Sequence, residues 1–112
     1  MRFAFICLSL VLLSVSTKAQ TAKFSTRGSG NESCATWLAT PLSEINARDW
    51  IFGFWSGENL GISANGSIGN VGHTTDALGI IGEVKKVCMK TPSMPLATAV
   101  SKVFIDFLKA DK

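Results

Sequence analysis

The apolar residues of this 112-residue chain recur with the period of an α-helix, most densely over residues 43–60. Trp50, Ile51, Phe54 and Trp55 stand at i, i+1, i+4 and i+5, a spacing that gathers them on one side of a helix rather than alternating as in a strand. A serine, typical of helix N-caps, opens the range, and a glutamate follows it where the positive end of the helix dipole lies. The pattern predicts a helix over 43–60 that organises the core.

Three more segments have helical patterns. A short one, over 34–40, begins after a capping serine and is ended or redirected by Pro41. A second runs over 74–89, with one of its first two threonines as the cap. The third, over 95–109, has the most regular apolar period. Residues 61–72, rich in Gly, Asn and Ser, form either a loop or a short Asn-Gly hairpin, and the loop is favoured because an isolated hairpin is marginal. The chain is therefore predicted to be all-α, a small bundle of three to four helices.

The N-terminal end has the pattern of a targeting signal. Arg2 precedes the apolar run 3–15, and small residues follow, so residues 1–19 are predicted to be a cleaved signal peptide. The run is shorter than the roughly 20 apolar residues of a membrane span, which disfavours a membrane anchor. The polar segment 20–32 is predicted to be a flexible arm, and 33–112 a single helical domain in the periplasm or outside the cell.

Two cysteines remain once Cys7 leaves with the signal, Cys34 and Cys88. In an exported protein such a pair predicts a disulfide, and the alternative is two separate buried thiols. Closing the loop between residues 34 and 88 with a disulfide stabilises a fold by about 4 kcal/mol in the chain-entropy model. Two cysteines and a distant histidine fall short of a structural zinc site, so no metal is expected.

Removal of the signal also changes the charge. Nine of the eleven Lys and Arg remain against eight Asp and Glu, which leaves a net charge of +1. The positive residues are dispersed, whereas nucleic-acid binding needs a clustered basic face. Neither a nucleic-acid partner nor, after cleavage, a membrane partner is expected.

Residues that could carry catalysis are sparse. His73 is the only histidine, and a nucleophilic site would need it beside Ser56 and Asp76, each of which has a simpler explanation in its local sequence. There is no phosphate-binding glycine loop and no Cys-x-x-Cys pair. The chain is predicted not to be an enzyme and to need no cofactor.

Aromatic and glycine residues gather in and before the helix predicted over 43–60. Gly53 and Gly57, four residues apart, leave a flat notch on one side of this helix. The notch is either an interface for a second copy or a ligand or, as favoured here, the place where another helix of the same chain crosses closely. Too many aromatic residues lie here for all to point inward on a small domain, so they form either a binding face or a core wrapped around the helix. The residues of this candidate binding or packing face are Trp37, Trp50, Phe52, Gly53, Phe54, Trp55 and Gly57.

The order of these motifs resembles the HdeA/HdeB family of periplasmic acid-stress chaperones. The resemblance rests on Cys34-x-x-Trp37-Leu38, Gly53-Phe54, Asp76-x-x-Gly79-Ile80, Cys88 and the Lys-ended last helix. It implies a homodimer that loosens in acid and holds unfolded client proteins on exposed apolar surface.

A second resemblance is to small periplasmic immunity proteins of the type VI amidase-immunity (Tai-like) group. It rests on Phe52-Gly53-Phe54-x-x-Gly57, followed by a cysteine, Pro92 and an Ala-containing amphipathic last helix. It implies an inhibitor that binds one toxin or enzyme partner. Both resemblances describe an exported, helical, disulfide-bonded protein that binds other proteins.

Overall fold

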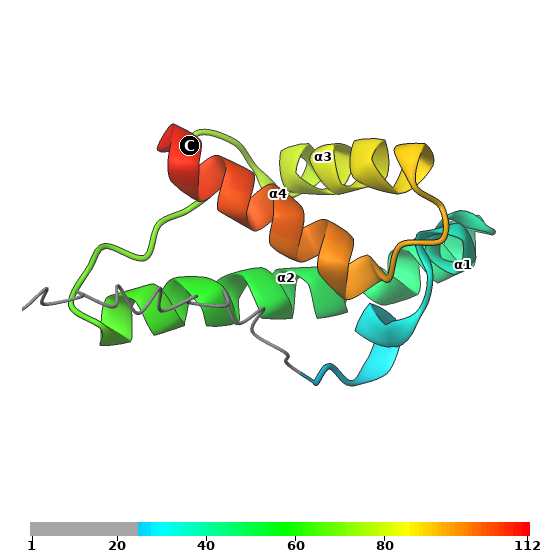
Figure 1. Cartoon of the computed structure of the whole chain (residues 1–112), viewed down its shortest axis with the longest axis horizontal. Coiled ribbons are helices and arrows are strands. Elements are labelled where there is room, and N and C mark those ends of the chain that lie inside the picture. Colours follow the sequence, from blue (N-terminus) through cyan, green and yellow to red (C-terminus); the bar gives the residue numbers. More distant parts are fainter. Residues whose placement is uncertain (1–24) are drawn as a thin grey trace, which may run out of the picture.

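The structure is a computed structural model that describes residues 25–112. These residues form one short 3₁₀-helix and four α-helices (Figure 1). No residue in that range belongs to a β-strand, and one isolated bridge joins Ser33 to Pro95. The all-α prediction is confirmed, whereas the predicted signal peptide and the start of the arm lie outside the described residues. None of the described helices is long and apolar enough to cross a membrane. The elements are η1 (Gly28–Asn31), α1 (Cys34–Leu38), α2 (Pro41–Ala64), α3 (Ala77–Lys90) and α4 (Leu96–Ala110).

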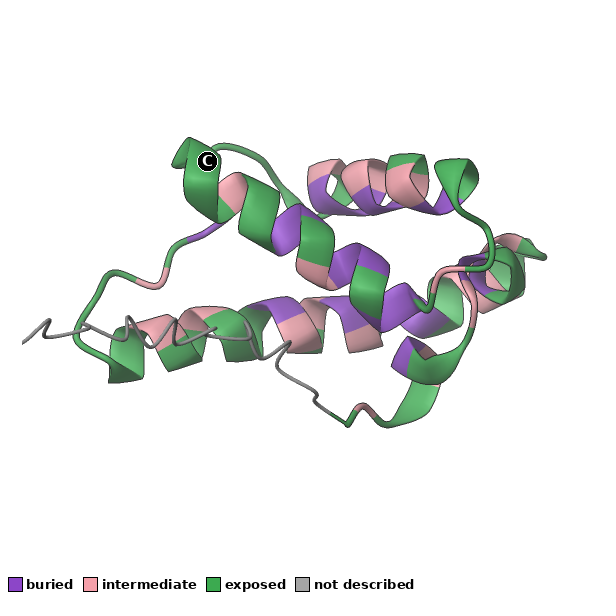
Figure 2. Cartoon of the chain, in the orientation of Figure 1, coloured by how far each residue is buried: buried purple, intermediate pink, exposed green. Residues whose placement is uncertain are grey.

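Helix α4 is the centre of the packing. It turns back on α3 as a helical hairpin and lies between α3 and α2, while α1 lies at the N-terminal end of α2 (Figure 1). The buried positions of α2, α3 and α4 face one another in this arrangement (Figure 2). The largest members of the core are Trp37, Ile51, Trp55, Ile80, Ile81, Val84, Leu96, Val100 and Phe104.

The predicted disulfide is confirmed. Cys34 and Cys88 are both fully buried and bonded to each other, with Cα atoms 5.0 Å apart. The bond joins the first turn of α1 to the last turns of α3. A helix of only five residues would be marginal alone, so this crosslink and its neighbours hold α1 in place.

Helix α2 begins earlier than predicted. Thr40, not Ser43, is its N-cap, and the two residues form a reciprocal capping box in which each hydroxyl accepts the other's backbone N–H at 3.1 Å. Pro41 is therefore the first helical residue of α2, a position where its missing N–H costs nothing.

The same helix also ends later than predicted, at Ala64 rather than about residue 60. Gly66, with φ of 86°, reverses the backbone, while Gly66 N–H donates to Ser63 O and Ser67 N–H donates to Ile62 O. This Schellman motif identifies Asn65-Gly66 as a helix end, so the predicted loop begins four residues later. At α3 the cap is likewise displaced, since Asp76 rather than a preceding threonine accepts the Gly79 N–H at 2.9 Å.

The prediction of a flexible arm is wrong for residues 27–32. The indole N–H of Trp50 donates to Arg27 O at 2.6 Å, and the Trp50 ring lies directly over Gly30. A Cβ added to Gly30 would lie 2.1 Å from that ring, so the segment packs closely only because it lacks a side chain there. Backbone pairing of Glu32 O with Leu96 N–H at 2.8 Å then fixes the segment against the start of α4.

Candidate functional site

The aromatic residues predicted as one face divide between the core and the surface. Trp37 is fully buried, and its indole N–H donates to Glu44 O at 3.2 Å, which ties α1 to the first turn of α2. Trp55 is also buried, with its indole N–H donating to Val71 O at 2.8 Å. A buried indole whose polar atom is satisfied is a packing residue. These two tryptophans therefore belong to the core.

Trp55 also fixes the loop that follows α2. Its ring meets Phe104 and Phe107 edge-on, with centroids 5.0 and 5.6 Å away. One turn further along α2, the Asn59 side chain donates to Val71 O at 3.0 Å and accepts Val71 N–H at 2.9 Å. Three hydrogen bonds thus hold the backbone of one buried loop residue against the inner side of α2.

Trp50, Phe52 and Phe54 are half-buried. Trp50 and Phe54 stack with ring centroids 5.4 Å apart, beside a surface hollow of about 350 Å³ between α2 and residues 25–27. Phe52 packs against the edge of the core. These three rings are therefore packing residues with exposed edges.

Gly53 and Gly57 lie on the side of α2 away from its buried residues, and both are exposed. Gly53 also lines the hollow beside Trp50 and Phe54. A Cβ added at either position, or at Gly61 four residues on, would find no atom within 4 Å. Within residues 25–112 no helix crosses α2 at these glycines, so the favoured prediction of an intramolecular crossing is wrong. The notch is open.

The glycines are part of a longer surface, here called the outer face of α2. By helical spacing it consists of Leu42, Ile45, Asn46, Asp49, Gly53, Ser56, Gly57, Leu60 and Gly61. Leu42 is 67% exposed and Leu60 70%, and Asp49 is the only charged residue among the nine. The face thus carries one charge, although Asn46, Asp49 and Ser56 interrupt its apolar residues.

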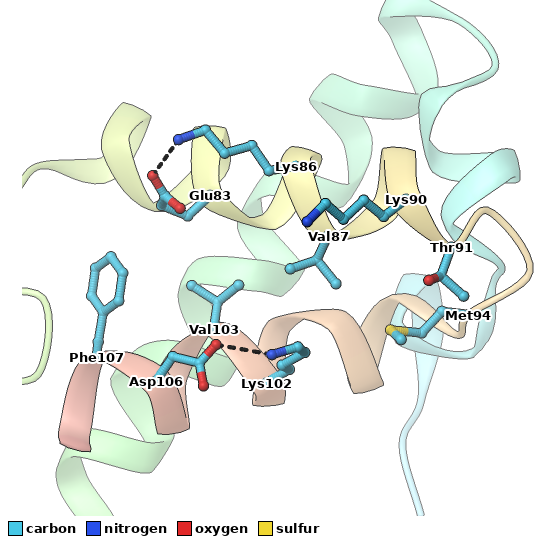
Figure 3. Close-up of a pocket in the computed structure, with 10 residues that line it drawn as sticks. All are labelled: Glu83, Lys86, Val87, Lys90, Thr91, Met94, Lys102, Val103, Asp106 and Phe107. Carbon is cyan, nitrogen blue, oxygen red and sulfur yellow. Dashed lines mark hydrogen bonds and ion pairs between the residues drawn. The ribbon is translucent and has the colours of Figure 1, made fainter. Parts of the chain in front are cut away.

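A second surface feature, the α3–α4 groove, opens between the two helices of the hairpin and has a volume of about 320 Å³ (Figure 3). Four apolar residues form its floor: Val87, Met94, Val103 and Phe107. Five charged residues, Glu83, Lys86, Lys90, Lys102 and Asp106, stand along its rim, and Thr91 completes the lining.

The charges at the rim are partly paired. Lys86 binds Glu83 of the same helix, α3, at 2.8 Å, and Lys102 binds Asp106 of the same helix, α4, at 3.0 Å. Lys90 has no ion-pair partner in the described part of the chain. The groove is therefore an apolar channel with one uncompensated cation at its rim.

The described residues bring together no group of His, Cys, Asp and Glu that could hold a metal ion. His73 is exposed, with Nδ1 3.3 Å from Asn70 O, and Asp76 accepts the backbone N–H at the start of α3. What these surfaces offer chemically is apolar contact with charged flanks, which suits binding.

The sequence alone did not indicate the groove. Of two adjacent lysines on α3, Lys85 binds Glu44 of α2 at 2.5 Å, whereas Lys86 is exposed at the groove rim. The repeat of basic residues at 86 and 90, one turn apart, was the available signal. It becomes meaningful only when α4 is known to lie alongside.

The chain matches no protein-family model, no curated protein and no solved structure. Both surfaces are therefore interpreted from their own chemistry.

Proposed function

We propose that the protein is an exported, non-enzymatic chaperone that acts as the HdeA/HdeB-like proteins do, holding unfolded client proteins in acid. The observation that carries the proposal is the outer face of α2, on which three large apolar residues, Leu42, Ile45 and Leu60, are exposed beside one charge. Surfaces of this kind commonly mark sites of protein interaction.

The shape of the outer face favours unfolded clients over a single rigid ligand. Gly53, Gly57 and Gly61 leave a smooth strip with no side chains, and Leu60 lies beside it. A smooth apolar strip imposes few steric requirements, so extended apolar segments of many sequences can lie along it. Apolar burial is non-directional, which allows such contacts without a fixed register.

The charge of the domain supports activation by acid. Residues 25–112 contain eight Lys or Arg and eight Asp or Glu, so protonation of the carboxylates and of His73 takes the net charge from 0 to +9. Self-repulsion at that charge loosens a small fold and keeps complexes soluble. Acid also removes the Glu44–Lys85 ion pair, the one such pair between two helices in this range, and with it a link between α2 and α3.

The test is light scattering from a client enzyme that aggregates in acid, measured at about pH 2–3 and at pH 7 with and without the oxidised protein. We expect suppression of aggregation in acid and none at neutral pH. Leu60→Lys should remove most of this protection, because it places a charge in the outer face. Leu108→Lys is the matched control, since Leu108 is a half-exposed leucine on α4 and its replacement should leave protection intact. Absence of protection at several-fold molar excess would overturn the chaperone proposal.

A second candidate function is that of an exported immunity or inhibitor protein with one toxin or enzyme partner. It is favoured by the outer face being already formed on a capped, continuous helix in the folded, disulfide-bonded state. It predicts tight one-to-one binding at neutral pH, measured by calorimetry with the purified partner, that Leu60→Lys abolishes. Binding that appears only in acid would exclude it.

A further inference from the structure

We propose that the α3–α4 groove binds an anionic amphiphile, a molecule with a single alkyl chain and a carboxylate or similar anionic head. The groove lies on the α3–α4 hairpin and shares no residue with the outer face of α2. The proposal therefore stands or falls independently of the chaperone function.

The floor of the groove suits an alkyl chain. Val87 of α3 and Val103 of α4 point toward each other across its middle, with Phe107 at one end and Met94 at the other (Figure 3). A volume of about 320 Å³ lies at the lower end of the range for small-molecule sites. Methionine and valine side chains provide apolar contact, and the methionine adapts to chain position.

The charges at the rim differ along the groove. The carboxylates of Glu83 and Asp106 lie toward the Phe107 end, whereas the Lys90 amine lies beside Val87, near the middle of the groove (Figure 3). Each carboxylate is neutralised by its own lysine, so the uncompensated charge is that of Lys90. An anionic head is attracted to the Lys90 amine, and the alkyl chain then lies along the apolar floor.

The single uncompensated cation distinguishes an amphiphile from the competing occupant, an amphipathic helix of a partner protein. A docked helix with acidic flanks would be matched by unpaired lysines along both rims. Here Lys86 and Lys102 are already engaged by acids of their own helices, and a single cation remains.

The experiment is a titration of the oxidised full domain with dodecanoate at about pH 7.5, below its critical micelle concentration. Methyl NMR signals of Met94, Val87 and Val103 report on the groove. We expect saturable one-to-one binding with shifts confined to these residues. Dodecyltrimethylammonium, with the same chain and a cationic head, should give no saturable binding.

Two charge-reversal variants supply the matched comparison. Lys90 and Lys109 each lie in the last turn of their helix, so their replacement has a similar effect on the helix dipole, but only Lys90 lines the groove. Lys90→Glu should weaken dodecanoate binding about fivefold, near the upper range for an exposed charge pair, and Lys109→Glu should change it less than about twofold.

A third variant tests the alkyl site. Val87→Gln should weaken binding while leaving the fold intact, because Val87 is only half-buried. Equal binding of the cationic amphiphile, or equal effects of Lys90→Glu and Lys109→Glu, would overturn the proposal. The proposal would also be overturned if this protein did not bind dodecanoate but bound an acidic amphipathic peptide in the groove. That result would assign the groove to a protein partner.

Discussion

The inner and outer sides of α2 are both apolar, but only the inner side is packed. On the inner side Ala47, Ile51 and Trp55 are buried against the other helices. On the outer side Leu42 and Leu60 are mostly exposed, although they are as hydrophobic as the residues that are buried. Hydropathy alone therefore does not decide which way this helix faces.

What orients α2 is a set of large side chains with defined polar contacts. Trp55 and Asn59, one turn apart, hold Val71 by three hydrogen bonds, and Trp50 holds the segment before α1 by one more. The outer face has no comparable contact within residues 25–112. Its leucines therefore remain available for contact with another molecule.

The largest effect that distinguishes the two sides is expected from Trp55→Ala. The substitution leaves a cavity against Phe104 and Phe107 and should lower the free energy of unfolding by about 3–5 kcal/mol. Urea denaturation followed by circular dichroism measures it. Trp50→Ala, which removes a half-buried indole from the same helix, should cost clearly less. Equal losses would show that the Trp55 side is not the principal core.

A smaller loss is expected from Asn59→Ala. The variant leaves the Val71 N–H without its side-chain partner, while Val71 O keeps the bond from the Trp55 indole, at a cost of about 1–3 kcal/mol. Amide hydrogen exchange at Val71 should accelerate more than exchange in α3. Asn46→Ala is the control, because Asn46 is exposed on α2 and gains the same helix propensity without losing a hydrogen bond. If both variants behave alike, Asn59 does not anchor the loop.

The fold was largely predictable from local patterns. Helical apolar spacing located all four α-helices, and cysteine number in an export context predicted the Cys34–Cys88 bond. The boundary errors have local causes. Ser43 was predicted as the N-cap of α2, but it is the partner of Thr40 in the capping box, and Gly66 was predicted to lie in a loop or hairpin, but it ends the helix. A search for capping boxes and for glycine-terminated helix ends would have found both ends of α2.

The candidate site was less predictable because it depends on which helices are neighbours. Nothing in the local sequence separates Gly30, which must lie under Trp50, from Gly53, where an added Cβ would meet no atom within 4 Å. Likewise, Val87 and Val103 have the pattern of core residues, and only the crossing of α3 and α4 leaves them at a groove. Tertiary contacts assign such residues, and periodicity cannot.

The smallest predicted effect tests whether the outer face is free. Gly53→Ala and Gly57→Ala should each raise the free energy of unfolding by about 1 kcal/mol, because alanine is the better helix former and its Cβ would meet no atom within 4 Å. Gly82→Ala on α3, where a Cβ also meets nothing, should give a similar gain, whereas Gly30→Ala should destabilise through its clash with Trp50. The remaining alternative is that a second copy packs against the outer face, and thermal denaturation at two protein concentrations tests it. In that case the stability of the wild type will rise with protein concentration. The substitutions at Gly53 and Gly57 will then reduce that dependence instead of stabilising the protein, because a close helix contact tolerates no added methyl group.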